Sequence, residues 1–273
     1  MVRFLVFPLV ALVIISFVSG AAVPKGLLPT YRYGRIIGGT PISIAEVPYM
    51  AQIVNYGAQY CGATIISNDA VVTAAHCLVG LIERWTKIRV GTNHRNSGTL
   101  LPIRKMVAHE NFESVEKGND VALIWLQEPL TFTSLIQKIP LVDPNTIVQP
   151  GQIALVTGWG YMMLNGYMPD QLMGVQVPII DREECNADYE GIITEDMICA
   201  GYPEGQKDAC SGDSGGPMVI KARLVGIVSF GYLCAQPGYP GVYTNVAHFA
   251  NWVTMKVSEE AAVNSTSTVS VLS

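Results

Sequence analysis

Three residue types that together support acyl transfer occur at separate places in the chain. The first is Ser214, in the sequence KDACSGDSGGP from 207 to 217. Glycines on both sides allow backbone angles that are closed to residues with a side chain, so this loop can present the serine hydroxyl. The N–H groups of Gly212 and Ser214 can then point the same way, as the oxyanion of a tetrahedral intermediate requires. The loop is thus suited to a nucleophile with its oxyanion hole, although a Gly/Ser turn between strands is the alternative that a GxSGG sequence alone favours.

A serine hydroxyl is a weak nucleophile unless a general base is close to it. His76 is the best candidate, because it ends the apolar run VVTAAHC, where two alanines leave space and Cys77 can fix the loop. The other histidines lie in polar turns or near a helix start and are interpreted as surface residues: His94, His109 and His248.

The third group is Asp120, which begins the sequence DVALIWL. Its charge runs directly into an apolar segment, and a histidine N–H would offset the cost of burying it. From the local pattern alone, a turn aspartate at the start of a strand remains the alternative.

The runs TAAHC, NDVAL and GDSGGP together resemble the trypsin-like serine peptidases of the chymotrypsin fold, and the order His, Asp, Ser is the order in that fold. The resemblance extends from 36 to about 257, and within the family the chain is similar to invertebrate trypsins. It implies an all-β domain of two six-stranded antiparallel β-barrels packed together, with a C-terminal α-helix. It also implies that Ser214 attacks the scissile carbonyl, His76 transfers the proton and Asp120 orients the imidazole. Ser229 matches a position that supports the aspartate in relatives.

Six cysteines in a chain with a secretory leader predict three disulfides, and spacing alone does not choose their pairing. The resemblance implies these pairs: Cys61 with Cys77, Cys185 with Cys199, and Cys210 with Cys234. The first would hold the histidine loop, and the third would tie the nucleophile loop to the wall of the neighbouring pocket.

The resemblance places Asp208, six residues before Ser214, at the bottom of the primary specificity pocket. An anion in a narrow slot favours Arg and Lys side chains, since an apolar side chain would leave it unpaired. Gly231 and Gly241 match glycines that keep the slot open, and Tyr189 is expected to line its base. Three positions depart from the residues usual in trypsins: Phe230, Leu233 and Ala209. Leu233 adds bulk at the rim of the pocket, so the relative preference for Arg and Lys substrates stays open.

Residues 1–20 predict a secretory signal peptide, because Arg3 precedes an apolar run that ends in small residues. A membrane anchor is the alternative, but the run is short for a membrane span and contains Pro8. We therefore expect a secreted protein without a membrane anchor.

Residues 21–35 are short, basic and rich in Pro and Gly, and they predict an activation propeptide that ends at Arg35. The resemblance implies that cleavage there frees the Ile36 ammonium, which folds inward and pairs with Asp213. A buried carboxylate needs such a cation, so the uncleaved chain should be latent. Arg35 also suits the expected specificity, so the activator is either another trypsin-like protease or the enzyme itself.

All 22 acidic residues and 13 of the 17 basic residues lie after Arg35, which gives a chain starting at 36 a formal charge of −9. No basic patch suggests nucleic acid. The expected partners are protein or peptide substrates with Arg or Lys and protein inhibitors of proteases, and we expect a monomer without a cofactor. The alternative function is an inactive peptidase homologue that only binds a partner. An esterase with a GxSxG elbow is disfavoured, because Pro217 follows the serine so closely.

Short segments rich in Val, Ile and Thr, broken by Gly, Asn, Asp and Pro, predict the antiparallel strands that must position these residues. They are 49–55, 61–67, 85–90, 121–126, 153–157 and 224–230. Apolar residues that recur every three or four positions over 246–257 predict one amphipathic helix.

The domain boundaries follow from composition. The peptidase domain is expected at 36–258, with a crossing between its barrels near 140–151. Residues 259–273 are polar and small, and they predict a disordered tail that carries a glycosylation sequon at Asn264. The loop 91–101 has no carboxylate, so no calcium site is expected there.

Overall fold

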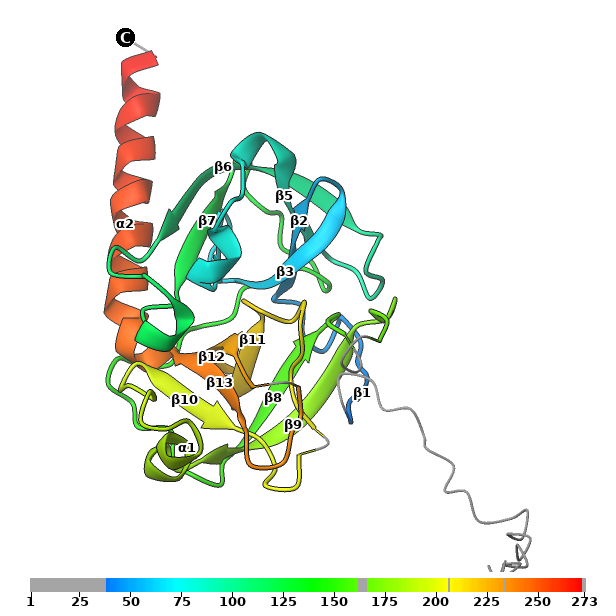
Figure 1. Cartoon of the computed structure of the whole chain (residues 1–273). Helices are drawn as coiled ribbons and strands as arrows, with labels where there is room; N and C mark the ends of the chain where they lie inside the picture. The colour runs from blue at the N-terminus through cyan, green and yellow to red at the C-terminus, as the bar shows by residue number, and fades with distance from the viewer. Residues whose placement is uncertain (1–37, 162–165, 206, 233, 272–273) are drawn as a thin grey trace, which may run out of the picture. The chain divides into compact units, whose positions relative to one another are not determined.

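The computed structural model describes residues 38–161, 166–205, 207–232 and 234–271, and this part of the chain forms two antiparallel β-barrels and a long C-terminal helix (Figure 1). The predicted fold class is therefore confirmed. The signal peptide, the propeptide with Arg35, Ile36 and the departure at Leu233 all lie outside the described residues.

The first barrel is closed by six strands in the order β2-β3-β4-β7-β6-β5. They are β2 (Met50–Asn55), β3 (Ala58–Ile65), β4 (Ala70–Thr73), β5 (Thr86–Val90), β6 (Thr99–Ala108) and β7 (Ala122–Leu126). The β2–β3 hairpin turns through Tyr56 and Gly57, which both have positive φ, as a two-residue loop of type I′ requires. Every residue of β7 is buried, so this strand lies in the centre of the core behind the predicted aspartate.

The second barrel contains six strands in the order β9-β10-β13-β12-β11-β8, and pairing of β8 with β9 closes it. They are β8 (Ile153–Gly158), β9 (Met173–Ile180), β10 (Met197–Ala200), β11 (Pro217–Ile220), β12 (Arg223–Phe230) and β13 (Gly241–Asn245), and β1 (Thr40–Pro41) also pairs with β9. The segment 140–151 lies between β7 and β8, in the connection between the barrels.

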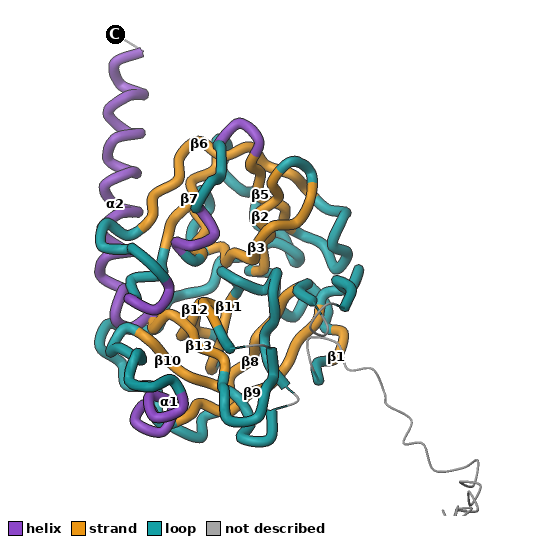
Figure 2. Tube along the Cα trace, in the orientation of Figure 1, coloured by secondary structure: helices purple, strands orange, loops and turns teal. Residues whose placement is uncertain are grey.

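Helix is confined to the periphery of the barrels in Figure 2, apart from short turns. These turns are η1 (Ala75–Leu78), η2 (Glu83–Trp85) and η3 (Val115–Lys117). The helix α1 (Arg182–Asp188) is absent from the sequence-based prediction, since seven residues are too few to establish a period. Its start is fixed locally, because the Asp181 carboxylate accepts the N–H groups of Glu183 and Glu184.

The C-terminal helix α2 (Val246–Val271) begins where the sequence predicts it and continues much further. The Asn245 side chain accepts the Ala247 N–H at 3.2 Å and caps the first turn. The expected disordered tail from 259 is not what the structure has. Glu260 is buried against β6, where it pairs with Arg104 and Lys105, and the helix continues past it to Val271. None of the helices in the described ranges combines the length and the apolar character needed to cross a membrane.

Candidate active site

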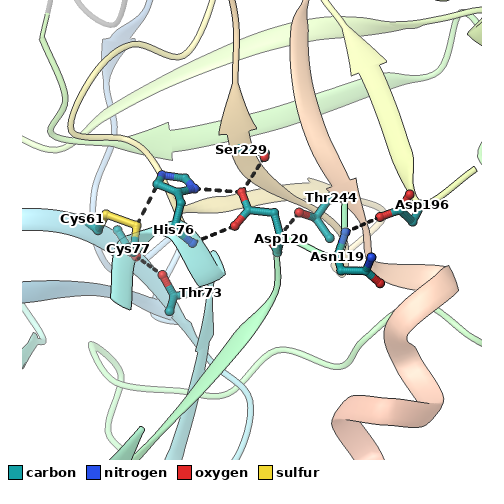
Figure 3. Close-up of polar contacts among 10 residues, drawn as sticks. Cys61, Thr73, His76, Cys77, Asn119, Asp120, Asp196, Ser229 and Thr244 are labelled. Carbon is teal, nitrogen blue, oxygen red and sulfur yellow. Dashed lines mark hydrogen bonds and ion pairs between the residues drawn. A yellow bond between two sulfur atoms is a disulfide. The ribbon is translucent and has the colours of Figure 1, made fainter. Parts of the chain in front are cut away.

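His76 and Asp120 meet between the barrels, as Figure 3 shows. The ring Nδ1 of His76 lies 2.8 Å from Asp120 Oδ2, and the backbone N–H of His76 donates to Oδ1 at 2.8 Å. An ionised carboxylate only accepts hydrogen bonds, so the ring proton resides on Nδ1 and the lone pair on Nε2. The imidazole is a quarter exposed and Asp120 is 3% exposed. The hydrogen bond to Asp120 thus fixes the tautomer of His76, with the Nε2 lone pair available to accept a proton.

Two strands of the other barrel also hold Asp120. Ser229 on β12 donates from its hydroxyl to Asp120 Oδ2 at 2.5 Å, and Thr244 on β13 donates to the Asp120 carbonyl oxygen at 2.6 Å. With the two bonds from His76, the buried carboxylate accepts three hydrogen bonds, which offset its loss of hydration. The aspartate is therefore fixed before any substrate arrives.

The loop that carries Ser214 packs against the first barrel. The Gly62 N–H donates to the Ser214 carbonyl oxygen at 2.8 Å, and Gly62 follows Cys61, which is disulfide-bonded to the neighbour of His76. Gly215 has φ +78°, and a Cβ there would lie 2.1 Å from the Thr73 hydroxyl oxygen. Only a glycine permits this approach. The loop that carries Ser214 is thus attached to the elements that carry His76.

The orientation of Gly212 is also supported from the first barrel. The Gln59 side-chain amide donates to the Gly212 carbonyl oxygen at 3.1 Å. Gly212 has φ +94°, and a Cβ there would lie 2.4 Å from the methyl carbon of Met168.

Asp213, next to the serine, is completely buried. Its two oxygens accept the Gly160 N–H at 2.7 Å and the Cys210 N–H at 3.0 Å. Burial raises the pKa of Asp213 to about 6, and the two hydrogen bonds act against this rise. Within the described part of the chain, no cationic side chain forms an ion pair with it.

Asp208 lies in a cavity of about 210 Å³ that Ser214 also lines. The carboxyl group is 4% exposed, and burial raises its pKa to about 7. Oδ2 accepts the Ala235 N–H at 3.1 Å, whereas no described residue gives Oδ1 a hydrogen bond. Gly231 and Gly241 are in the lining, and a Cβ at Gly241 would lie 2.5 Å from Asp208 Oδ1. The cavity can therefore accept a long side chain that ends in a cation.

Tyr189 is expected from the sequence to line the base of the pocket, but it is not among the residues that line this cavity. Its hydroxyl donates to the Pro240 carbonyl oxygen at 2.7 Å and accepts the Tyr232 N–H at 3.2 Å, so it supports the wall from behind. Tyr243 lines the cavity instead. Phe230, one of the departures, is also in the lining.

The structure forms the three disulfides that the resemblance implies: Cys61–Cys77, Cys185–Cys199 and Cys210–Cys234. The atoms of Cys61, His76 and Cys77 that could bind a metal lie within 4.8 Å of one another. The two sulfurs are bonded to each other, however, and thiolates are the form that binds zinc. This cluster is a histidine beside a disulfide, not a metal centre.

The other three histidines lie away from Asp120. His94 pairs with Asp170 at the surface at 2.7 Å, and His248 is exposed on α2. His109 is less exposed than the surface interpretation suggests, because it packs against Phe249 and Trp252 of α2. Burial there lowers the pKa of His109.

A comparison with protein-family models identifies the Trypsin family over residues 36–253. The chain belongs to the trypsin family. It is a serine endopeptidase of the chymotrypsin fold, and trypsin-like proteases act on protein substrates.

Several curated members of the trypsin family are similar over most of their length. The vitellin-degrading protease of Bombyx mori is 44% identical over 230 residues, which cover 82% of this chain and 87% of that protein. Trypsin epsilon of Drosophila erecta is 39% identical over 249 residues, with 89% and 95% covered. A trypsin of Xenopus laevis is 39% identical over 233 residues, with 84% and 93% covered. The resemblance to invertebrate trypsins is thus confirmed.

Several residues of this trypsin-family site could not be found from local sequence. Thr244 and Tyr243 lie in the short strand β13, where no chemical motif marks them. Gln59 and Asp196, which accepts the Asn119 N–H beside Asp120, are ordinary polar residues until the fold places them. The only available signal was the resemblance itself, which identified Ser229 in the same region.

Proposed function

We propose that the chain is made as a secreted zymogen which, once cleaved after Arg35, hydrolyses peptide bonds on the carboxyl side of Arg and Lys. The observation that carries this specificity is Asp208, whose Oδ1 has no partner among the described residues in a cavity shared with Ser214. A substrate guanidinium or ammonium would supply the missing partner. An apolar side chain would leave a buried carboxylate unpaired, which costs binding free energy in the transition state.

In the proposed mechanism, the Ser214 hydroxyl oxygen attacks the scissile carbonyl carbon while His76 Nε2 takes its proton. The N–H groups of Gly212 and Ser214 stabilise the resulting oxyanion. His76 then returns the proton to the leaving nitrogen, and water hydrolyses the acyl-enzyme by the same steps. The support for these roles is the fixed tautomer of His76, since its Nδ1–H points at Asp120 and leaves Nε2 unprotonated.

Activation is proposed to depend on Asp213. Its carboxylate is buried with two N–H donors, and burial raises its pKa, so a cation brought to it would be bound strongly. The Ile36 ammonium, freed by cleavage after Arg35, is the proposed cation. Because Asp213 precedes Ser214, this pairing would order the nucleophile loop only in the processed chain.

Secretion is proposed from residues 1–20, and Asn264, which falls within α2, stays a predicted glycosylation site. N-terminal sequencing of protein secreted by a eukaryotic host, before and after activation, would identify both cleavage sites. A mature secreted form that still begins at Met1 would contradict the proposal.

The specificity is tested with the processed enzyme and matched peptide amides that end in Arg, Lys, Phe or Ala. We expect kcat/KM to be highest for Arg and Lys. Asp208→Asn should reduce it for these two substrates by about 10³-fold or more, since the charge partner is removed from a buried site. Glu204→Gln, which removes an exposed acidic charge nearby, is the matched control and should leave the preference unchanged. Faster cleavage after Phe or Ala by the unmodified enzyme would refute the assignment.

A further inference from the structure

Two residues of the second barrel hold the backbone that carries Asp120, as Figure 3 shows. Asp196 Oδ2 accepts the Asn119 N–H at 2.6 Å, and Thr244 donates to the Asp120 carbonyl oxygen at 2.6 Å. The two are close because Met197, which follows Asp196, pairs with Thr244 between β10 and β13. Thr244 of β13 and the residue that precedes β10 thus hold two consecutive residues, Asn119 and Asp120.

Asp196 is itself fixed and largely buried. The Thr194 hydroxyl donates to its Oδ1, and its own carbonyl oxygen accepts the Asn245 N–H at 2.8 Å. It is 9% exposed. These contacts fix the Asp196 carboxylate relative to β10, which begins at the next residue. The carboxylate in turn fixes the position of the Asn119 N–H.

The segment held by Asp196 contains two consecutive residues with positive φ. Asn119 has φ +56°, in the left-handed region that asparagine adopts more readily than most residues with a side chain. The preceding Gly118 has φ +78°, and a Cβ there would lie 2.4 Å from Asp196 Oδ2, so only glycine fits at this position. The Asp196 carboxylate contacts this turn at both positions.

We propose that Asp196 is a positioning residue: its carboxylate holds the turn at 118–119 so that the Asp120 carboxylate meets His76. Asp196 contacts neither the imidazole nor the cavity that Ser214 lines, so it acts through Asp120 alone. The inference rests on the proposed roles of His76 and Asp120. It predicts that catalysis by His76 and Asp120 depends on a hydrogen-bond acceptor from the second barrel, the Asp196 carboxylate.

The test compares Asp196→Ala and Asp196→Asn in the full chain processed after Arg35, with active sites titrated by diisopropyl fluorophosphate. We expect Asp196→Ala to lower kcat for an Arg amide by about 10- to 100-fold with little change in KM, since a misplaced catalytic group loses its alignment. The apparent pKa of the base in the profile of kcat/KM should fall, because the imidazolium loses part of its carboxylate partner. Asp196→Asn should recover most of kcat, because the amide oxygen can still accept the Asn119 N–H.

The matched control is Glu195→Ala, which removes the adjacent exposed acid and should leave kcat and the pH profile unchanged. Three results would overturn the inference. In the first, Asp196→Ala lowers only the melting temperature. In the second, Asp196→Asn is as impaired as Asp196→Ala, which would indicate an effect of charge. In the third, the downfield NMR proton of the His76–Asp120 hydrogen bond is unchanged in Asp196→Ala.

The NMR signal also separates this inference from the proposed function. If the unmodified enzyme neither hydrolyses Arg amides nor reacts with the fluorophosphate, the proposed function fails, and the proton signal still decides the role of Asp196. If Asp196→Ala does not fold, Thr194→Val removes a donor to the carboxylate and should give a smaller fall in kcat of the same kind. An unchanged kcat and an unchanged proton signal in Thr194→Val would then count against it.

Discussion

Asp208 and Asp213 are two buried carboxylates at the ends of one short loop, and they face different surroundings. Asp213 is enclosed: both oxygens accept backbone N–H groups, and Cβ atoms at Gly158 and Gly160 would lie 2.0 and 2.4 Å from them. Asp208 lines the cavity of about 210 Å³, and its Oδ1 has no hydrogen-bond partner among the described residues. Burial raises the pKa of both, to about 6 for Asp213 and about 7 for Asp208.

The comparison suggests how one loop can serve both activation and specificity. Each carboxylate is destabilised by burial in its ionised form, so each gains from a cation. The enclosed site suits a cation that arrives once and stays, which the proposal assigns to the chain's own new amino terminus. The open site suits a cation that enters and leaves with every turnover, which the proposal assigns to the substrate. The surroundings of the carboxylates, not their chemistry, determine these roles.

The strongest test of this comparison is Asp213→Asn. We expect the processed variant to lose about 10³-fold in kcat/KM, since the Ile36 ammonium would lose its partner and a buried ion pair broken on one side costs several kcal/mol. Titration with diisopropyl fluorophosphate would show whether the loss reflects fewer competent sites. Asp143→Asn, at an exposed acid paired with Arg223, is the control and should retain activity. Full activity of Asp213→Asn would remove the distinction between the two carboxylates.

A second test uses pH to separate the open carboxylate from the catalytic base. Because the pKa of Asp208 is raised to about 7, its neutral form predominates below that value and does not attract a cation. The ratio of kcat/KM for Arg and Ala amides cancels any effect of pH on the catalytic steps that both substrates share. This ratio should fall roughly tenfold between pH 8 and pH 6, as expected for one group with this pKa.

The variant Asp208→Asn provides the reference for that measurement, because its ratio should not change with pH. A ratio for the unmodified enzyme that stays constant from pH 8 to pH 6 would mean that Asp208 remains ionised in the empty cavity.

The sequence predicted the parts of the candidate site that depend on local context. Glycines around Ser214, the alanines before His76 and the apolar run after Asp120 are all visible within a few residues. The partners that hold these groups come from distant parts of the chain and carry no local signal. Asp196 is 77 residues from Asn119, and Thr244 is 124 residues from Asp120. Only the folded barrels bring them together.

The extension of α2 could not be predicted for the same reason. The sequence after Ser258 is polar and small, which is typical of disorder. Glu260 is nevertheless anchored by Lys105, which lies 155 residues away, and by the adjacent Arg104. A window of local sequence does not contain either of these partners.

Glu260 is a third buried carboxylate, and it differs from Asp208 and Asp213 because side chains of the folded protein, Arg104 and Lys105, already pair with it. Hydrogen bonding to Lys105 and then to Arg104 lowers the pKa of Glu260, the opposite direction to Asp208 and Asp213. A lowered pKa in the folded state means that the stabilisation is present above the unfolded pKa and is lost as the pH falls through the folded one. We expect Glu260→Gln to reduce the free energy of unfolding by about 1 kcal/mol at pH 7, a small value because its partners Arg104 and Lys105 are partly exposed and solvent screens the two ion pairs.

Urea denaturation of Glu260→Gln at pH 7 and pH 3 would measure this difference, with Glu259→Gln as the matched control at an exposed neighbour on the same helix. The destabilisation should be smaller at pH 3, which lies below the unfolded pKa of a glutamate, because the stabilisation is lost as the pH falls toward the lowered pKa of Glu260. The kcat should not change, because the pairing lies on β6, away from the cavity that Ser214 lines. Equal stability of the two variants at pH 7 would show that a buried carboxylate with permanent cations adds nothing to this fold.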